Sequence, residues 1–267
     1  MQRKALKHAP LVPTCRVFFD EFLKSDFFLE EDGVSILVTP TCARCKSLFG
    51  VGEVEEVETR GNVSRITLND LTASLSIYTT KNKPLHVERS VEASAGGKKT
   101  FFAFLGDVHV REGAGRSKRA IILAEEVGTV EERVRNGWIL NTAWRTMERA
   151  NALRSTLSLP KEEEPVFLDQ DSLKQAREHY ALDSDKLDLF AGTAINAVKR
   201  MWQHYHTTTS EIIVEMVKNA GTSGMEREKL VSALKNKGLH TKWIEEVIDE
   251  LIMDEHCYEQ DTGVLRC

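Results

Sequence analysis

Residues 66–78 read ITLNDLTASLSIY, in which apolar and polar residues alternate on both sides of a short polar turn. A period of two residues is typical of β-strands with one buried face, so this stretch predicts a β-hairpin. One face of the hairpin is apolar and comprises Ile66, Leu68, Leu75 and Ile77. The other face carries hydroxyl groups, an aromatic ring and a cation, from Arg65, Thr67, Ser74, Ser76 and Tyr78. Either water or a ligand could cover that second face.

Further strand-like runs occur at 47–57, 100–110 and 120–127, and with the hairpin strands at 63–69 and 73–78 they make five. Between the third and fourth strands, the spacing of apolar residues near 85–91 permits a short helix. Five strands with a helix at this position predict an OB-fold, a small β-barrel that binds single strands or sugars across its second and third strands. We assign residues 39–129 to this domain and 1–38 to an N-terminal extension.

The chain has 267 residues, 41% of them hydrophobic, which is enough for one large domain or two to three small ones. No apolar run approaches the length of a membrane span, and the first residues lack the continuous apolar stretch of a secretion signal. We therefore expect a globular protein without a membrane partner, located in the cytoplasm.

Charge is distributed unevenly along the chain. Residues 40–130 contain 13 Lys and Arg against 11 Asp and Glu, whereas residues 150–267 contain 14 against 21. A polyanion is therefore expected to bind within residues 40–130 and to be repelled by residues 150–267.

Cationic side chains gather in the predicted loop between the fourth and fifth strands, VREGAGRSKR at 110–119. This is the loop of an OB-fold that can close over a bound strand, although a solvated turn would have the same composition. The cations of this predicted DNA clamp are Arg111, Arg116, Lys118 and Arg119.

Two aromatic residues are candidates for stacking on bases. Tyr78, with Arg65 and Lys81 nearby, could stack a base and hold its phosphate, or could simply pack against its neighbouring strand. Alternation on the fourth strand places Phe102 and Phe104 in the core and leaves Phe101 on the face shared with His109 and Arg111. The residues predicted to bind DNA are Arg65, Thr67, Ser76, Tyr78, Lys81, Phe101, Arg111, Arg116, Lys118 and Arg119.

Residues 130–157 predict a long amphipathic helix with a broad apolar stripe. Such a stripe fits either a helix capping its own barrel or a helix shared among subunits, and its width favours a subunit interface. Small Ala143 and Ala150 would allow neighbouring helices to approach closely. The predicted interface residues of this oligomerisation helix (130–159) are Ile139, Leu140, Ala143, Trp144, Met147, Ala150 and Leu153.

A helical linker at 160–207, with helices at 171–182 and 184–206, precedes a unit at 208–267. That unit shows three helical stretches and a hairpin turned at 261–263, the pattern of a winged helix. If the apolar side of its third helix faces the core, the exposed side is acidic and comprises Glu246, Asp249 and Glu250. Acidic side chains repel DNA phosphates, so we expect this face to bind partner proteins with basic surfaces.

The five cysteines are an odd and scattered set, which favours reduced thiols over a disulfide framework. Cys42 and Cys45 have the spacing of half a zinc site, but no second pair lies at a matching distance. We therefore expect free thiols and no metal. We also find no nucleophile motif, no metal-like pair of carboxylates in the barrel and no Gly-rich nucleotide loop, so we expect neither catalysis nor a cofactor, and an enzyme acting on RNA or DNA is disfavoured.

Several stretches resemble the archaeal replication protein A family, in particular its middle-sized subunit. They are Arg16–Phe18, Thr39–Thr41, Phe49 and Gly52, Asp70, Thr72 and Tyr78, the run WILNTAWRTMERANAL at 138–153, and AREHYALD at 176–183. The resemblance implies one OB-fold joined to a winged helix. It also implies a single-stranded DNA-binding subunit of a hetero-oligomer, expected to be a heterotrimer, in replication, repair and recombination. The post-barrel helices would join the subunits, and the winged helix would recruit replication and repair enzymes.

The chain departs from that family's pattern at several barrel positions. Ala73 and Thr80 stand where the family usually has Gly, Ser76 where it has a second aromatic residue, and Leu123–Glu125 where it has Arg-Pro-Glu. Fewer rings and one fewer arginine imply weaker DNA binding, because each stacked base contributes about 1–3 kcal/mol. A second hypothesis therefore stays open, in which the chain is a structural or interaction subunit of the complex with little DNA binding of its own.

Overall fold

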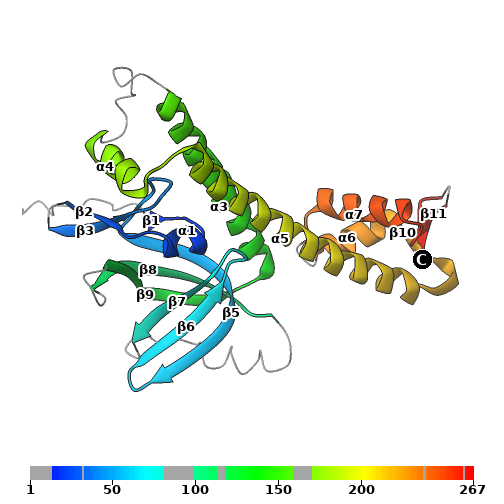
Figure 1. The fold of residues 1–267 in the computed structure, drawn as a ribbon. Coiled ribbons are helices and arrows are strands. Elements are labelled where there is room, and N and C mark those ends of the chain that lie inside the picture. Colours follow the sequence, from blue (N-terminus) through cyan, green and yellow to red (C-terminus); the bar gives the residue numbers. More distant parts are fainter. Residues whose placement is uncertain are drawn as a thin grey trace, which may run out of the picture. The chain divides into compact units, whose positions relative to one another are not determined.

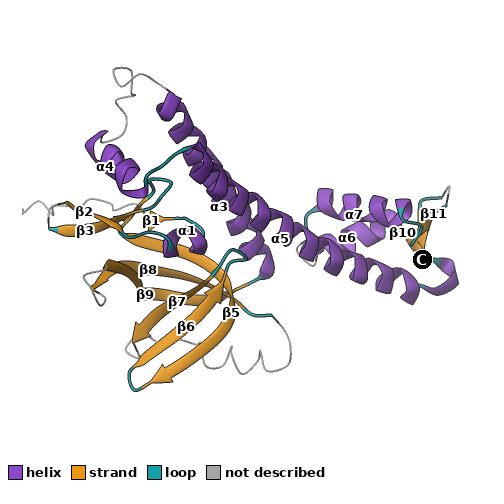
Figure 2. Cartoon of the chain, viewed as in Figure 1, coloured by secondary structure: helices purple, strands orange, loops and turns teal. Residues whose placement is uncertain are grey.

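The computed structural model describes residues 14–31, 33–80, 99–112, 118–158, 170–236, 239–260 and 262–267. The chain divides into two compact units, Met1–Val198 and Lys199–Cys267. Figure 1 labels the helices and strands, and Figure 2 separates helices from strands by colour.

Five strands of the first unit form a closed barrel (Figure 1). They are β5 (Ser47–Arg60), β6 (Val63–Asn69), β7 (Ser74–Thr80), β8 (Phe101–Glu112) and β9 (Lys118–Val130). Their order is β5-β6-β7-β9-β8, β8 pairs back with β5, and β7 runs parallel to β9. This closure, with the fifth strand inserted beside the third, confirms the predicted OB-fold. The short helix predicted near 85–91 lies outside the described residues.

The hairpin that predicted the fold has the expected faces. Ile66 lies opposite Ile77 and Leu68 opposite Leu75, and all four are at most 4% exposed. On the other face Thr67 lies opposite Ser76, with their hydroxyl oxygens 3.1 Å apart. The alternation of the sequence is therefore the alternation of core and surface in the barrel.

The segment assigned to an N-terminal extension is largely part of the folded unit, which corrects that boundary. β1 (Thr14–Cys15) pairs in parallel with β5, and α1 (Phe19–Leu23) lies against the barrel (Figure 1). The side chains of Phe18, Phe19 and Phe22 are buried. Gly50 of β5 makes room for this packing, because a Cβ there would lie 2.4 Å from the Phe104 ring and 2.9 Å from the Phe19 ring.

A second, three-stranded sheet consists of β2 (Phe27–Glu31), β3 (Val34–Val38) and β4 (Arg44–Cys45). α4 (Gln170–Tyr180) holds its β2–β3 hairpin through one side chain. The Tyr180 hydroxyl accepts hydrogen bonds of 3.1 Å from the backbone N–H groups of Asp26 and Phe27, and donates one of 2.6 Å to the Val38 carbonyl. Burial raises the pKa of Tyr180 to about 12, so the phenol keeps its donor proton.

The two long helices are α3 (Glu132–Ser158) and α5 (Ser184–Asn219). The break expected in α5 after residue 206 is absent. Thr207 bonds the Gln203 carbonyl four residues earlier at 3.0 Å, which satisfies its hydroxyl without ending the helix. Leu153 of α3 packs with Leu173 and Leu187. Among the described helices, none combines the length and the apolar character that crossing a membrane requires.

The second unit begins at Lys199, earlier than the predicted boundary at 208. After α5 it contains the 3-10 turn η2 (Gly221–Ser223), β10 (Met225–Glu226), α6 (Arg227–Asn236), α7 (Thr241–Met253), β11 (Tyr258–Glu259) and β12 (Val264–Arg266). The three strands form an antiparallel sheet in the order β10-β12-β11. The unit therefore has the helices and the terminal hairpin that the sequence predicts.

Four of the five cysteines form disulfides, so the expectation of reduced thiols is wrong for them. Cys15 is bonded to Cys45, and Cys257 to Cys267. In the first pair the cause is the tertiary structure, because β1 pairs with β5 and also contacts β4, which carries Cys45, 30 positions after Cys15. In the second pair the two cysteines flank an antiparallel hairpin. Only Cys42 is free.

Candidate nucleic-acid interface

The outer face of the hairpin carries four of the residues predicted to bind DNA. Arg65 lies opposite Tyr78, and Thr67 lies opposite Ser76. All four side chains are half-buried, between the core and the open surface. The structure therefore brings them together on one face, as the alternation predicts.

This face continues across the barrel onto β9 and β8. Tyr78 pairs with Leu123 of β9, and Arg119 points to the same side because it lies four residues from Leu123. Arg119 in turn lies opposite Arg111 of β8. At about 3.4 Å per residue, Arg119 is about 14 Å along the strand from Leu123. Arg111 and Arg119 thus share the outer face with Tyr78.

Two exposed arginines face each other at the open ends of these strands. Arg111 and Arg119 are cross-strand partners, and the neighbouring Lys118 lies opposite Glu112. All three cations are exposed. Like charges directly opposite each other on a sheet are unfavourable, and an anion between them removes that cost.

Arg65 differs from its predicted role, because carboxylates already surround it. Its Nη2 lies 3.0 Å from Glu56 and 3.2 Å from Glu58, both on the adjacent strand β5. The pairing of Glu58 directly opposite Arg65 places these charges together. The charge of Arg65 is thus offset within the barrel, and its availability to a phosphate is reduced.

Phe101 is not an exposed stacking platform, which corrects a second prediction. It is 5% exposed, and the guanidinium carbon of Arg135 lies 4.8 Å from the centre of its ring. Arg135 belongs to α3, which packs on β8 and covers this end of the strand. Burial lowers the pKa of Arg135 from its usual value, while Glu132 acts in the opposite direction. The remaining predicted DNA-binding residues, Lys81 and Arg116, lie outside the described residues.

The apolar stripe of α3 is largely used inside its own unit. Ile139 and Ala150 are fully buried, Ala143 is 7% exposed and Leu153 is 4% exposed. These four are therefore packed within the first unit and are not available to another subunit. Of the seven predicted interface residues, Leu140 and Met147 are half-buried and Trp144 is 58% exposed. An interface through this helix stays a prediction that rests on Trp144 and these two neighbours.

A buried polar network anchors α3 to the N-terminal segment. Glu21 is 2% exposed and accepts a hydrogen bond of 2.5 Å from the Thr39 hydroxyl. Arg149 of α3 places its Nη2 3.4 Å from the same carboxylate and donates from Nε to the Thr41 hydroxyl at 2.7 Å. Residues 39–41 and Arg149 belong to the stretches that resemble the replication protein A family, and here they have a structural role.

The face of α7 is acidic, as predicted. Ile244, Val247, Ile248 and Leu251 are buried in the core of the second unit, whereas Glu246, Asp249 and Glu250 are exposed. Two of these carboxylates have basic residues as neighbours. Asp249 lies 2.5 Å from Arg227, which also contacts Glu245 and Glu259, and Glu250 lies 2.5 Å from His206. Docking of partners on this face stays a prediction.

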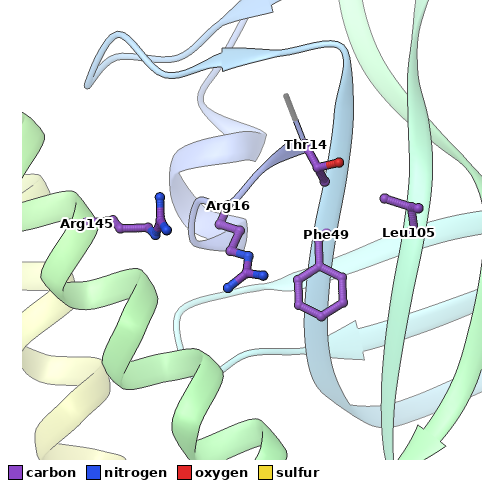
Figure 3. A pocket seen from close by; sticks show the side chains of 5 residues that line it. All are labelled: Thr14, Arg16, Phe49, Leu105 and Arg145. Carbon is purple, nitrogen blue, oxygen red and sulfur yellow. The ribbon is translucent and has the colours of Figure 1, made fainter. Parts of the chain in front are cut away.

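A pocket on the first unit escaped sequence analysis. It has a volume of about 340 Å³ and is lined by Thr14, Arg16, Phe49, Leu105 and Arg145 (Figure 3). Three of these residues occur in the stretches that resemble the replication protein A family, but they are far apart in the sequence. Only the pairing of β1, β5 and β8 and the packing of α3 bring them together. Within the described part of the chain, no group of three or more His, Cys, Asp or Glu side chains is arranged to hold a metal ion.

Comparison with known proteins gives only distant structural likenesses. No protein-family model matches the chain, and no curated protein sequence matches it. The Stn1–Ten1 complex of S. pombe is similar with a TM-score of 0.38 and 11% identity, over 51% of this chain and 93% of that chain. A replication protein A heterotrimer bound to single-stranded DNA has a TM-score of 0.37 and 13% identity, over 52% and 98%. Aspartyl tRNA synthetase from Entamoeba histolytica has a TM-score of 0.24 and 11% identity, over 68% and 36%. We base neither fold nor function on these weak likenesses.

Proposed function

We propose that this chain is a non-enzymatic, single-stranded DNA-binding subunit of a replication protein A-like hetero-oligomer that acts in replication, repair and recombination. The observation that carries the proposal is the cross-strand pair of Arg111 and Arg119, exposed on the barrel face that also holds Tyr78. Two like charges held opposite each other are a ready site for a phosphate.

A bound strand would cross β7, β9 and β8 on this face. Its phosphates would lie near Arg111, Lys118 and Arg119, and one base would stack on Tyr78. Stacking on a ring combined with contacts to the backbone gives binding without sequence preference, because every base has an aromatic face and every nucleotide has a phosphate.

Replacement of Arg111, Lys118 and Arg119 together by Gln tests the proposal. Affinity for oligothymidine should fall, and the slope of log affinity against log salt should become shallower by about 2, because each phosphate contact to a single strand contributes about 0.7. The matched control replaces Lys24, Arg133 and Lys174, three exposed cations elsewhere on the same unit, by Gln. Equal affinities and slopes for the two triple variants would exclude DNA binding by this face.

A second candidate function is that of a structural or interaction subunit with little DNA binding of its own. It is favoured by the ion pairs that surround Arg65 and by the burial of Phe101 under Arg135. Under this hypothesis the wild-type chain by itself would bind oligothymidine no better than the triple variant, yet would co-purify with the other subunits.

The second unit would be a winged helix that recruits partner proteins rather than duplex DNA. The support is its element order and the acidic exposed side of α7, where Glu246, Asp249 and Glu250 would repel phosphates and attract basic protein surfaces. Subunits would meet at the exposed Trp144 of α3. Replication and repair enzymes are the partners that the family resemblance implies for this unit.

A further inference from the structure

We propose that the pocket lined by Thr14, Arg16, Phe49, Leu105 and Arg145 binds a nucleotide. The phosphate would lie between the guanidinium groups of Arg16 and Arg145, and the base would rest against Phe49 and Leu105. None of the lining residues is acidic, and the volume of about 340 Å³ falls within the range of small-molecule sites. Neither arginine forms an ion pair within the described part of the chain.

The pairing of β1 with β5 fixes the position of Arg16. Thr14 lies opposite Ser47 and Cys15 opposite Leu48, so the next residue of each segment brings Arg16 to Phe49. The guanidinium carbon of Arg16 lies 4.9 Å from the centre of the Phe49 ring. A guanidinium held over a ring keeps its N–H edge for a ligand, because the stacking uses its flat face. The Cys15–Cys45 disulfide covalently fixes this segment to β4.

Arg145 approaches the pocket from α3 (Figure 3). Its Nε donates a hydrogen bond of 2.9 Å to the side-chain oxygen of Asn141, one turn earlier on the helix. This bond orients the guanidinium and uses one of its donors, while the two Nη groups are the ones that form paired contacts with phosphate oxygens. Arg16 and Arg145 thus supply two guanidinium groups from two different elements.

The apolar part of the pocket favours a nucleotide over a bare anion. Phe49 and Leu105 are cross-strand partners on β5 and β8, and both are half-buried rather than closed off by the protein. A free phosphate would leave this surface uncovered, whereas a base would cover it and gain stacking or dispersion energy. The Thr14 hydroxyl adds a polar group that can accept or donate a hydrogen bond.

This site is separate from the proposed DNA face and does not depend on it. Leu105 shares β8 with Arg111, but it lies six residues away, about 20 Å along the strand. Phe49 lies on β5, whereas Tyr78 lies on β7, which pairs with β6 and β9. The nucleotide could be a free mononucleotide or one unit of a single strand, since both present the same phosphate and base.

Binding of thymidine monophosphate and of oligothymidine to the full chain, measured by calorimetry, tests the proposal. Thymidine, which lacks the phosphate, is the ligand control. Arg16→Gln or Arg145→Gln should weaken binding about 10-fold or more, because a charge-assisted contact is lost. Both arginines are exposed, so the variants should fold as the wild type does. Arg133→Gln, an exposed arginine of the same helix, should leave binding unchanged, and so should Tyr78→Ala for the mononucleotide.

A lower affinity of either arginine variant for thymidine monophosphate supports a site for free nucleotides. If only oligothymidine binds and the same variants weaken it, the pocket holds one unit of a strand. Absence of binding by both probes, equal affinity for thymidine and its monophosphate, or equal affinities of wild type and both arginine variants would overturn the proposal. The triple variant of Arg111, Lys118 and Arg119 tests the DNA face and leaves the pocket residues unchanged. Its result and the results of the two pocket variants can therefore differ, so the two proposals can fail independently.

Discussion

The carboxylate of Asp70 accepts a hydrogen bond of 2.7 Å from the backbone N–H of Phe19, the first residue of α1. It also accepts hydrogen bonds from the backbone of Thr72 at 2.9 Å, from the Thr72 hydroxyl at 2.6 Å and from the backbone of Ala73 at 3.2 Å. One fully buried side chain therefore ties the β6–β7 turn to the helix whose phenylalanines enter the core.

Asp70 should make stability depend on pH. Burial raises its pKa from 3.8 to about 6, although its hydrogen bonds act in the opposite direction. Folding therefore takes up a proton between these values. The stabilisation that Asp70 gives the folded state is fully present below about pH 4. It is lost as the pH rises past about 6, which lowers the free energy of unfolding by up to about 3 kcal/mol. Urea denaturation of the wild type and Asp70→Asn at several pH values should show the wild type losing stability relative to the variant across this window. Parallel profiles would contradict the prediction.

The pair of Glu21 and Arg149 should be strongly coupled. Arg149→Met leaves a buried carboxylate without its cation, so we expect a loss of about 3 kcal/mol in the free energy of unfolding. Combining it with Glu21→Gln should cost less than the sum of the two single changes. Arg133→Met, at an exposed position of the same helix, should change stability by less than about 0.5 kcal/mol. Additive effects in the urea-denaturation cycle would show that the two side chains act independently.

Tyr78→Ala should weaken oligothymidine binding by about 1–3 kcal/mol, because a stacking platform is lost from the outer face. Tyr78→Phe keeps the ring and should bind nearly as the wild type does. Fluorescence anisotropy gives the affinities, and thermal melting shows whether the barrel is intact. If Tyr78→Ala melts earlier while its affinity is unchanged, the ring only packs against its cross-strand neighbours.

Trp144→Ser should release the chain from its proposed partner subunits without unfolding it, because the indole is 58% exposed on α3. Ile139→Asp on the same helix places a charge at a fully buried position and should unfold the first unit instead. Co-purification from the native cell, together with a melting curve for each variant, separates the two effects. Undiminished co-purification of Trp144→Ser would place the interface elsewhere.

Cys42 should react slowly with iodoacetamide in the folded protein. Burial raises the pKa of its thiol from 9.0 to about 12, and Glu21 acts in the same direction, so the reactive thiolate is about a thousandfold rarer. Mass spectrometry should find no label on the native protein and one after unfolding without reductant. After reduction all five cysteines should be labelled. Five labels without reductant would show that the disulfides are absent in solution.

The sequence by itself determined which residues of each element share a face. Ile66 and Leu68 face the barrel core and Ile244 and Val247 face the core of the second unit, because periods of two and 3.6 residues are properties of a strand and of a helix. The five strands and the long helices follow from the same local patterns, and so does the OB-fold, since few topologies fit that order of elements.

What covers each face was decided only by the tertiary structure. Phe101 has the parity of an outward residue, yet Arg135 of α3 lies over its ring. The ion pairs of Arg65 depend on the register of β5 beside β6. The contact of Arg16 with Phe49 depends on the pairing of β1 with β5. Periodicity gives the direction of a side chain but not its neighbours, which come from segments that are distant in sequence and close only after folding.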